Sequence, residues 1–263
     1  MGDLETDLQR ARSAVGEDLD ALLHHSSVAV LSALLENHAI DPTRLCVLLS
    51  RKDLPAEFLE ELGARKSLLK DYSVKKALAF HPRAPRLVGI RLFRDLYLLD
   101  LAQFALSPSV SQELKRYAEE QILARLPQLP LGQKITLARR GPGRVAGALV
   151  AQGHQQVLPV ALNNPFLTES NVLKALAREK VSTSVIQALV NHPKWSQSYN
   201  VRLALVRNPN TPLATVLAFL PHITVSDLRV LVEPGIIPLS LRKYLEAEVQ
   251  RRMHAAKNRS TEP

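Results

Sequence analysis

The chain has 263 residues, of which 46% are hydrophobic, so it is long enough to bury a substantial core in one elongated domain or two. No apolar run approaches the roughly 18 uninterrupted residues of a membrane span, and the acidic N-terminus lacks the basic start and apolar core of a signal peptide. The single cysteine, Cys46, excludes a disulfide framework and fits a reducing compartment. We therefore expect a cytoplasmic protein that does not enter a membrane.

Short segments with helical apolar periodicity alternate along the chain with corners that end one helix and begin the next. Asparagine or histidine followed by proline ends a helix, because proline has no amide hydrogen to donate and clashes with the preceding turn. Aspartate or threonine begins the next helix by capping its free amides. In chain order the corners are at Asp41-Pro42, His81-Pro82, Pro108, Gly141, Asn164-Pro165, His192-Pro193, Asn208-Pro209 and Pro234.

The stretch VRLALVRNPNTPLATVLAFLPH, residues 201–222, contains one such corner in full. Asn208 tolerates the left-handed conformation that is common at helix C-termini, and Pro209 forbids continuation of the helix. Thr211 is expected to cap the following helix, with Pro212 in its first position. The stretch therefore predicts a tight helical corner.

The corner prolines recur with an irregular period in the twenties, with 26 residues from Pro82 to Pro108 and 28 from Pro165 to Pro193. Helical units of this length bury their apolar faces only against their neighbours, which is typical of an α-solenoid. The sequence thus predicts an all-α fold built from short helical repeats.

These "ALVxNPxTPxxxLxxL" units resemble the leucine-rich-repeat-variant and HEAT-like families of bacterial α-solenoids, over roughly Val30 to Arg252. The resemblance implies a right-handed superhelical solenoid with an extended concave surface. Some leucine-rich-repeat-variant proteins also carry a cysteine-ligated iron–sulfur cluster, but with Cys46 alone no cofactor is expected. HEAT-like DNA glycosylases use tryptophan, acidic and arginine side chains. Since Trp195 is the only tryptophan and no acidic residue lies between Glu179 and Asp227, that activity is not carried over.

Charge is divided unevenly along the chain. Residues 1–63 hold 5 Lys and Arg against 12 Asp and Glu, a balance of −7, whereas the rest holds 29 against 13, or +16. We expect an acidic N-terminal helical cap region at 1–63, basic α-solenoid repeats at 64–252 and a disordered polar tail at 253–263. The acidic segment either caps the exposed apolar end of the solenoid or competes with an anionic partner as an internal mimic.

The segment PRLVGIRLFRDLYLL offers one candidate site. Its apolar residues Val88, Leu92, Leu96 and Leu99 recur along one side at helical spacing. Arg86, Arg91 and Arg94 fall within an arc of about 140° on the opposite side at about 100° per residue. This stripe is either a solvated helix face or a binding site for phosphate or carboxylate groups.

The segment KITLARRGPGRVAGALV offers a second candidate site. Gly141, Gly143 and Ala146 match the spacing of a dinucleotide-binding fingerprint, but that motif needs a preceding strand and an acidic residue about 20 positions on. We therefore interpret it as a glycine-loosened junction between helices, which is either an ordinary repeat turn or an anion contact helped by helix-start amides. Its basic residues are Lys134, Arg139, Arg140 and Arg144.

Catalysis finds little support in the sequence. The eight histidines are scattered, and no sequence of the CxxC, HExxH, GxSxG or GKS/T type is present. His81 and His192 occupy the corner position held elsewhere by Asn164 and Asn208, so we expect them to cap helices. No catalytic residue, metal ligand or small-molecule substrate is expected.

The most economical functional hypothesis is a non-enzymatic binding scaffold whose basic surface holds an acidic protein partner. The alternative is sequence-nonspecific binding of duplex nucleic acid through its phosphates, since a pI near 9.8 fits both.

Overall fold

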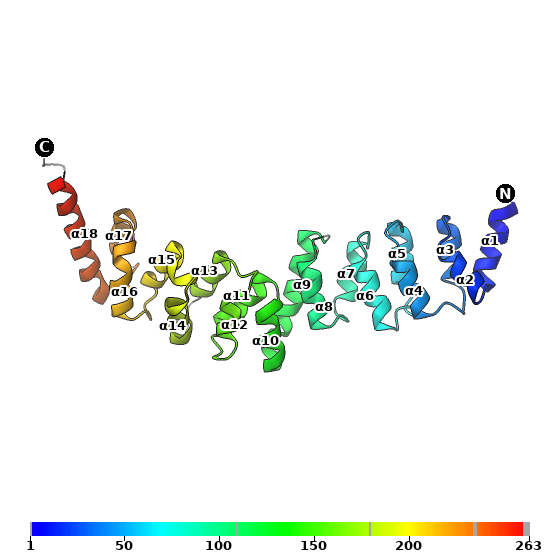
Figure 1. Cartoon of the computed structure of the whole chain (residues 1–263), viewed down its shortest axis with the longest axis horizontal. Coiled ribbons are helices and arrows are strands. Elements are labelled where there is room, and N and C mark those ends of the chain that lie inside the picture. The colour runs from blue at the N-terminus through cyan, green and yellow to red at the C-terminus, as the bar shows by residue number, and fades with distance from the viewer. Residues whose placement is uncertain (1, 109, 179, 234–235, 260–263) are drawn as a thin grey trace. The chain divides into compact units, whose positions relative to one another are not determined.

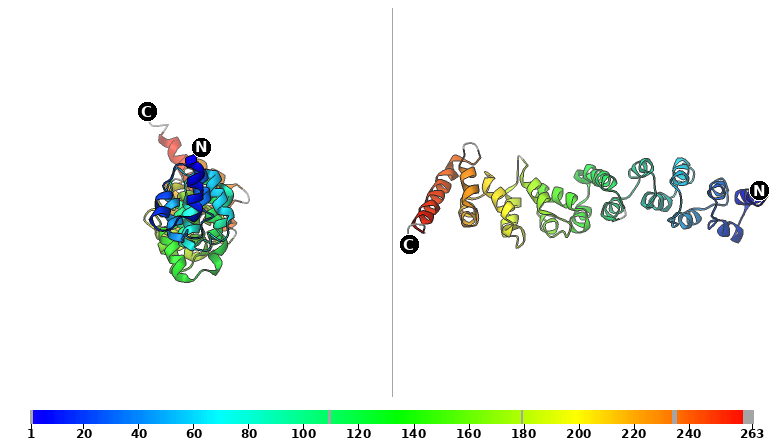
Figure 2. Two further views of the ribbon diagram at one scale, coloured as in Figure 1. Left: turned by 90° about the vertical axis from the view of Figure 1, so that its right-hand side faces the viewer. Right: turned by 90° about the horizontal axis from the view of Figure 1, so that it is seen from above.

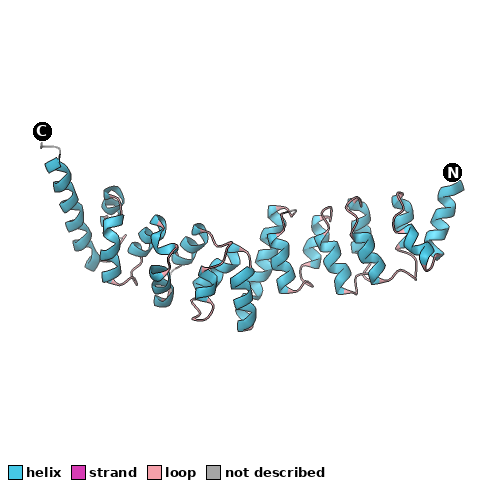
Figure 3. Cartoon of the chain, viewed as in Figure 1, coloured by secondary structure: helices cyan, strands magenta, loops and turns pink. Residues whose placement is uncertain are grey.

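The computed structural model describes residues 2–108, 110–178, 180–233 and 236–259, and over these ranges it contains helices and no strands (Figure 3). The all-α fold predicted from the helical periodicity is therefore confirmed. The GxGxxA spacing at Gly141 has no strand before it in the described part of the chain, in agreement with the rejection of a dinucleotide-binding unit.

The helices belong to two compact units, Met1–Arg125 and Leu126–Pro263, which we call unit 1 and unit 2. Within each unit the helices follow one another in chain order (Figure 1). Unit 1 contains α1 (Gly2–Ser13), α2 (Glu17–Leu22), α3 (Val28–Leu34), α4 (Pro42–Leu49), α5 (Ala56–Ala64), α6 (Tyr72–Phe80), α7 (Arg86–Leu92), α8 (Leu98–Leu106) and α9 (Gln112–Arg125). Unit 2 contains α10 (Leu131–Arg140), α11 (Gly143–Gln152), α12 (Leu158–Leu162), α13 (Glu169–Leu176), α14 (Thr183–Asn191), α15 (Tyr199–Arg207), α16 (Leu213–Phe219), α17 (Val225–Val232) and α18 (Leu239–Arg259). Short 3-10 turns lie at Leu126–Gln128, Trp195–Gln197 and Leu220–His222.

Helices two apart in the chain pack against each other within each unit. In unit 1, α3 contacts both α1 and α5, and α4 contacts α6 (Figure 2). In unit 2, α12 contacts both α10 and α14, and α13 contacts both α11 and α15. Most of the helices are short, and their apolar stripes are buried against neighbouring helices.

Unit 2 repeats unit 1 element by element. One constant difference in residue number, which we call the unit offset, carries the first residue of α4, Pro42, onto that of α13, Glu169. The same offset carries the last residue of α7, Leu92, onto that of α16, Phe219, and it relates both ends of every helix between them. Buried leucines coincide under it as well. Examples of identical pairs are Leu49 and Leu176, Leu62 and Leu189, Leu78 and Leu205, and Leu101 and Leu228.

The period in the twenties expected from the sequence matches the spacing of the first helix pairs, because α1, α3 and α5 begin at Gly2, Val28 and Ala56. The polar contacts repeat over a longer distance, from one whole unit to the next.

A buried asparagine joins consecutive helix pairs in each unit. The Nδ2 group of Asn37 donates hydrogen bonds to the carbonyl oxygens of Ala11, at 2.8 Å, and Ala14, at 2.9 Å. The Nδ2 group of Asn164 makes the same two bonds, to Ala138 at 2.8 Å and Gly141 at 3.0 Å. Because the last carbonyls of a helix have no partner within it, one amide side chain completes the end of α1 or of α10.

Arginine and tryptophan side chains complete other helix ends in the same way. Arg125 donates to the carbonyl oxygens of Phe93, Arg94 and Leu96, just beyond the end of α7. Its counterpart Arg252 donates to Leu220 and Ile223 just beyond the end of α16. The indole of Trp195 is buried and donates to Leu162 O at 2.9 Å. Arg125 and Arg252 therefore stabilise the fold, although a count of charges from the sequence includes them in the basic surface.

Most of the predicted corners have the expected caps. Asp41 caps α4 by accepting from Arg44 N, and Thr168 caps α13 by accepting from Asn171 N. His81 and His192 are the C-cap residues of α6 and α14, which confirms their structural placement. In each case Nδ1 accepts the amide hydrogen of the residue two positions on, as asparagine Oδ1 does in the other corners.

The corner at Asn208 differs from its prediction in two respects. Asn208 is extended, with φ of −78°, rather than left-handed, because its side chain closes the turn by accepting from Asn210 N. Thr211 does not cap α16, whose N-cap is Pro212. The Thr211 side chain is buried and its hydroxyl instead donates to Leu205 O at 2.6 Å. Threonine therefore completes the end of the preceding helix rather than the start of the next.

The predicted division at 1–63, 64–252 and 253–263 remains a prediction, and the compact units divide the chain elsewhere. Of the expected tail, residues 253–259 form the end of α18, and residues 260–263 lie outside the described residues. The corner expected at Pro234 also lies outside them.

Replacement of Asn164 by alanine should lower the free energy of unfolding by about 1–3 kcal/mol, because two buried carbonyl oxygens lose their donor. The neighbouring Asn163 is exposed and makes one bond, to Pro159 O. Asn163→Ala is therefore the matched control and should change stability by less than about 0.5 kcal/mol. Chemical denaturation of both variants measures the difference, and equal midpoints would contradict the capping role of Asn164.

Candidate anion-binding surface

The first predicted site, the stripe of Arg86, Arg91 and Arg94, does not lie on one helix. Arg86 opens α7 and Arg91 lies in its last turn, but Arg94 follows the helix in a turn. Val88, Leu92 and Leu96 are buried as expected, whereas Leu99 is 52% exposed because the chain turns before α8 begins. The continuous helix assumed in the prediction is therefore wrong.

The arginines of this stripe also have partners within the protein. A guanidinium nitrogen of Arg86 lies 2.6 Å from Glu113 Oε1, and both side chains are exposed. Arg91 Nε donates to Leu87 O at 3.3 Å, within the same helix. Because the charge of Arg86 is already balanced by a carboxylate, the stripe is a weaker candidate for an external anion.

Other cations of unit 1 are balanced in the same manner. Lys75 Nζ lies 2.6 Å from Asp95, and Lys76 Nζ lies 2.7 Å from Asp100. Although burial opposes ionisation, hydrogen bonds from Lys76 and Tyr72 hold the pKa of Asp100 below its usual value. Burial and the bond to Asp100 raise the pKa of Tyr72 to about 12. This part of unit 1 therefore presents alternating charges of both signs.

The second predicted site lies where α10 meets α11. Arg139 and Arg140 are exposed in the last turn of α10. Positive charge at this end of a helix interacts favourably with the negative end of the helix dipole. Lys134 Nζ is 3.4 Å from Pro127 O, and Arg144 is exposed in the first turn of α11. Within the described part of the chain, Arg139 and Arg140 take part in no ion pair. The four basic residues of the second predicted site therefore lie on two consecutive helices, three on α10 and one on α11.

The glycines of this junction serve packing rather than anion binding. A methyl group added at Gly143 would lie 2.0 Å from Phe166 O, and one added at Gly147 would lie 2.9 Å from Asn171 Cβ. The start of α11 is therefore pressed against the corner before α13, with a carbonyl oxygen over it. The expectation that this junction is loosened by glycine is wrong, because its glycines permit a close approach of two helices.

Charge is not shared equally by the two units. Residues 1–125 hold 17 Lys and Arg against 18 Asp and Glu, whereas residues 126–263 hold 17 against 7, so the balances are −1 and +10. The contrast is sharpest at the first two helices of each unit. Residues 1–25 hold two basic and six acidic residues, and the equivalent residues 128–152 hold four basic residues and no acidic ones. The excess positive charge of the protein therefore resides in unit 2.

Residues that the sequence interpretation missed include two equivalent tyrosine–aspartate pairs. Tyr72 OH donates to Asp100 and accepts from Tyr97 N, while Tyr199 OH donates to Asp227 and accepts from Thr224 N. The pairs link α6 to α8 and α15 to α17, and the unit offset relates each residue to its counterpart. Comparison of the sequence with itself at that offset would have found them. We assign these pairs a structural role, because in each pair the tyrosine hydroxyl donates its hydrogen bond to the aspartate carboxylate.

The described residues contain no group of three or more His, Cys, Asp and Glu side chains placed to hold a metal ion. No helix in the described ranges combines the length and the apolar composition that crossing a bilayer requires. Comparisons with protein-family models, with curated proteins and with solved structures find no match for this chain. The site must therefore be interpreted from its own geometry.

His192 supplies a test of the corner geometry by pH. Burial and the nearby Lys194 lower the pKa of His192 below its ordinary value of 6.5. Because folding lowers this pKa, the folded state favours the neutral form of the imidazole. The contribution of His192 to stability is therefore present above pH about 6.5 and is lost as the pH falls below that value. Replacement by asparagine, which holds the equivalent position in other corners, should remove this dependence.

The measurement is urea denaturation of the parent protein and of His192→Asn at several pH values between about 5 and 8, the range in which histidine titrates. The difference in unfolding free energy should shift in favour of the variant as the pH falls. A difference that stays constant over that range would show that folding does not favour the neutral form of His192.

Proposed function

We propose that this protein is a non-enzymatic binding scaffold and that the basic surface of α10 and α11 holds an acidic protein partner in the cytoplasm. The proposal includes a right-handed superhelical arrangement of the helix pairs, as the resemblance to HEAT-like and leucine-rich-repeat-variant proteins implies. The repeated packing of helices two positions apart, as between α3 and α5 and between α13 and α15, supports that arrangement. Successive helix pairs in such a stack present one continuous surface to a partner.

The single observation that carries the proposal is the difference in charge between two otherwise equivalent units. Unit 1 balances its cations internally, with ion pairs such as those of Lys75, Lys76 and Arg86. Unit 2 has the same fold with a balance of +10. Folding alone does not require this excess, since unit 1 achieves the same packing near neutrality. An anionic partner accounts for it.

Duplex nucleic acid remains the alternative, because phosphates would satisfy the same side chains. The two candidates differ in salt dependence. Binding of arbitrary duplexes should weaken with a log–log slope of about −0.9 for each phosphate that is neutralised. A protein partner should instead be selected by shape as well as charge, and should be retained from native lysate after nuclease treatment.

Charge reversal compares the two candidate sites in the full chain. Replacement of Arg139, Arg140 and Arg144 by glutamate should weaken binding of a fluorescent glutamate-rich peptide at least about tenfold, which corresponds to about 1.4 kcal/mol. The matched control replaces Arg86, Arg91 and Arg94 by glutamate, with the same change in net charge. Titrations at two salt concentrations, after circular dichroism has shown that both variants are helical, provide the comparison.

Equal losses in the two triple variants would show that net charge alone governs binding and would remove the junction of α10 and α11 as a site. Tight binding of random duplex DNA with a steep salt slope, together with no binding of the peptide, would favour the alternative function.

A further inference from the structure

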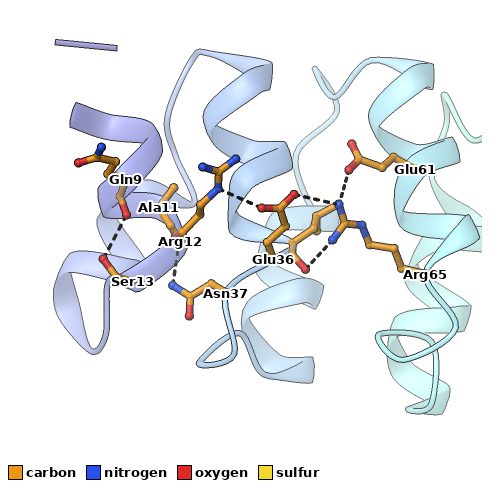
Figure 4. Close-up of polar contacts among 9 residues, drawn as sticks. Gln9, Ala11, Arg12, Ser13, Glu36, Asn37, Glu61 and Arg65 are labelled. Carbon is orange, nitrogen blue, oxygen red and sulfur yellow. Dashed lines mark hydrogen bonds and ion pairs between the residues drawn. The ribbon is translucent and has the colours of Figure 1, made fainter. Parts of the chain in front are cut away.

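A row of alternating charges runs in unit 1 from the end of α1, past the turn that follows α3, to the end of α5 (Figure 4). Arg12 Nε donates to Glu36 Oε2 at 3.0 Å. The guanidinium of Arg65 lies 3.8 Å from the other oxygen of Glu36 and donates to Glu61 at 2.6 Å. Glu61 also accepts from Ser32 Oγ at 2.7 Å. Each carboxylate in the row is therefore held by at least one arginine.

Unit 2 retains the first cation of this row and lacks both acids. Under the unit offset, Arg139 takes the place of Arg12. The two acids are replaced by uncharged residues, Asn163 for Glu36 and Ala188 for Glu61. The second arginine, Arg65, is replaced by His192. The pKa of His192 is lowered by burial and by Lys194, so this ring adds no charge at neutral pH. Among the described residues, Arg139 is thus left as a cation without the carboxylate that its counterpart has.

The buried asparagine beside this position makes equivalent hydrogen bonds in both units. Asn37 and Asn164 follow Glu36 and Asn163 directly, and each donates to the two carbonyls that flank the retained arginine. The residue before each buried asparagine is therefore placed alike with respect to α1 or α10. The side chain of Asn163 does not substitute for a carboxylate, because its Nδ2 group donates to Pro159 O at 2.9 Å. The space beside Arg139 corresponds to the space that the Glu36 carboxylate fills.

Neighbouring replacements increase the attraction for an anion. Lys134 stands where unit 1 has Asp7, and Arg144 stands where it has Glu17. In unit 1 Asp7 lies 3.9 Å from Arg10 and 3.5 Å from His25, whereas position 137, which corresponds to Arg10, is a leucine. Two acids have therefore become bases on the first two helices of the second unit. Such a surface favours a chain segment that carries several negative side chains.

We infer that Arg139 receives a carboxylate side chain of an acidic peptide segment in the position that Glu36 occupies beside Arg12, with Lys134 and Arg144 contacting further acidic residues of the segment. The inference rests on the proposed function and names its ligand chemistry. A guanidinium presents paired donors that match the two oxygens of a carboxylate. The contact between Arg12 and Glu36 shows that this helix geometry accommodates a carboxylate without a change of fold.

The test returns the missing carboxylate to unit 2 in the full chain. Asn163→Glu should form an internal pair with Arg139 and should weaken binding of the glutamate-rich peptide by about three- to fivefold, the upper part of the range for one exposed ion pair. Asn163→Gln provides a neutral side chain of the same size and should bind like the parent. Gln187 lies on α14, where the equivalent residue of α5 is Glu60, so Gln187→Glu adds the same negative charge at another position and controls for the change in net charge.

The inference holds if Asn163→Glu weakens the peptide complex while Asn163→Gln and Gln187→Glu do not. It is overturned if Asn163→Glu and Gln187→Glu weaken binding equally, since charge at a distance then explains the result. If the reversal of Arg139, Arg140 and Arg144 abolishes peptide binding but Asn163→Glu has no effect, the proposed function stands and the carboxylate position alone is wrong. If the parent binds duplex DNA and not the peptide, both are wrong.

Discussion

The open carbonyl groups at the ends of short helices are the constraint on which this structure depends. A helix of seven to nine residues, such as α7 or α6, leaves about half of its carbonyls without a partner inside the helix. Side chains from following helices satisfy these groups in both units, as Asn37, Asn164, Arg125 and Arg252 do. Each helix pair is therefore completed by another part of the same unit. The helices must therefore pack in chain order, because only then do these side chains reach the open carbonyl groups of the preceding helices.

Local features of the fold could be predicted from the sequence because they depend on neighbouring residues. Capping by Asp41 and Thr168 and the histidine corners are examples, since each involves residues no more than three apart. The error at Thr211 arose because a buried hydroxyl can complete either of two helix ends, and the sequence does not distinguish them. The error at Leu99 arose because Phe93 and Leu96 are buried in the turn and continue the helical spacing past the end of α7.

The candidate site was predictable as a charge distribution but not as a set of contacts. Arg139, Arg140 and Arg144 stand out in a segment without acidic residues. Ion pairs that distinguish unit 1, however, join residues far apart in the chain, as Arg12 and Glu36 are. No local pattern reveals such pairs. The unit offset does so once it is recognised, because each residue of one unit then has a structural counterpart in the other.

The constant offset between equivalent residues has a consequence for how such a chain can vary. Asn37 and Asn164 reach carbonyls 26 and 23 positions earlier in both units. A single inserted residue between donor and carbonyl would rotate one helix by about 100° and turn the donor away. The two units nevertheless carry opposite charges at two equivalent positions, where Asp7 corresponds to Lys134 and Glu17 to Arg144. The number of residues between donor and carbonyl is thus the constrained property of this chain, whereas the charge of its surface residues can vary.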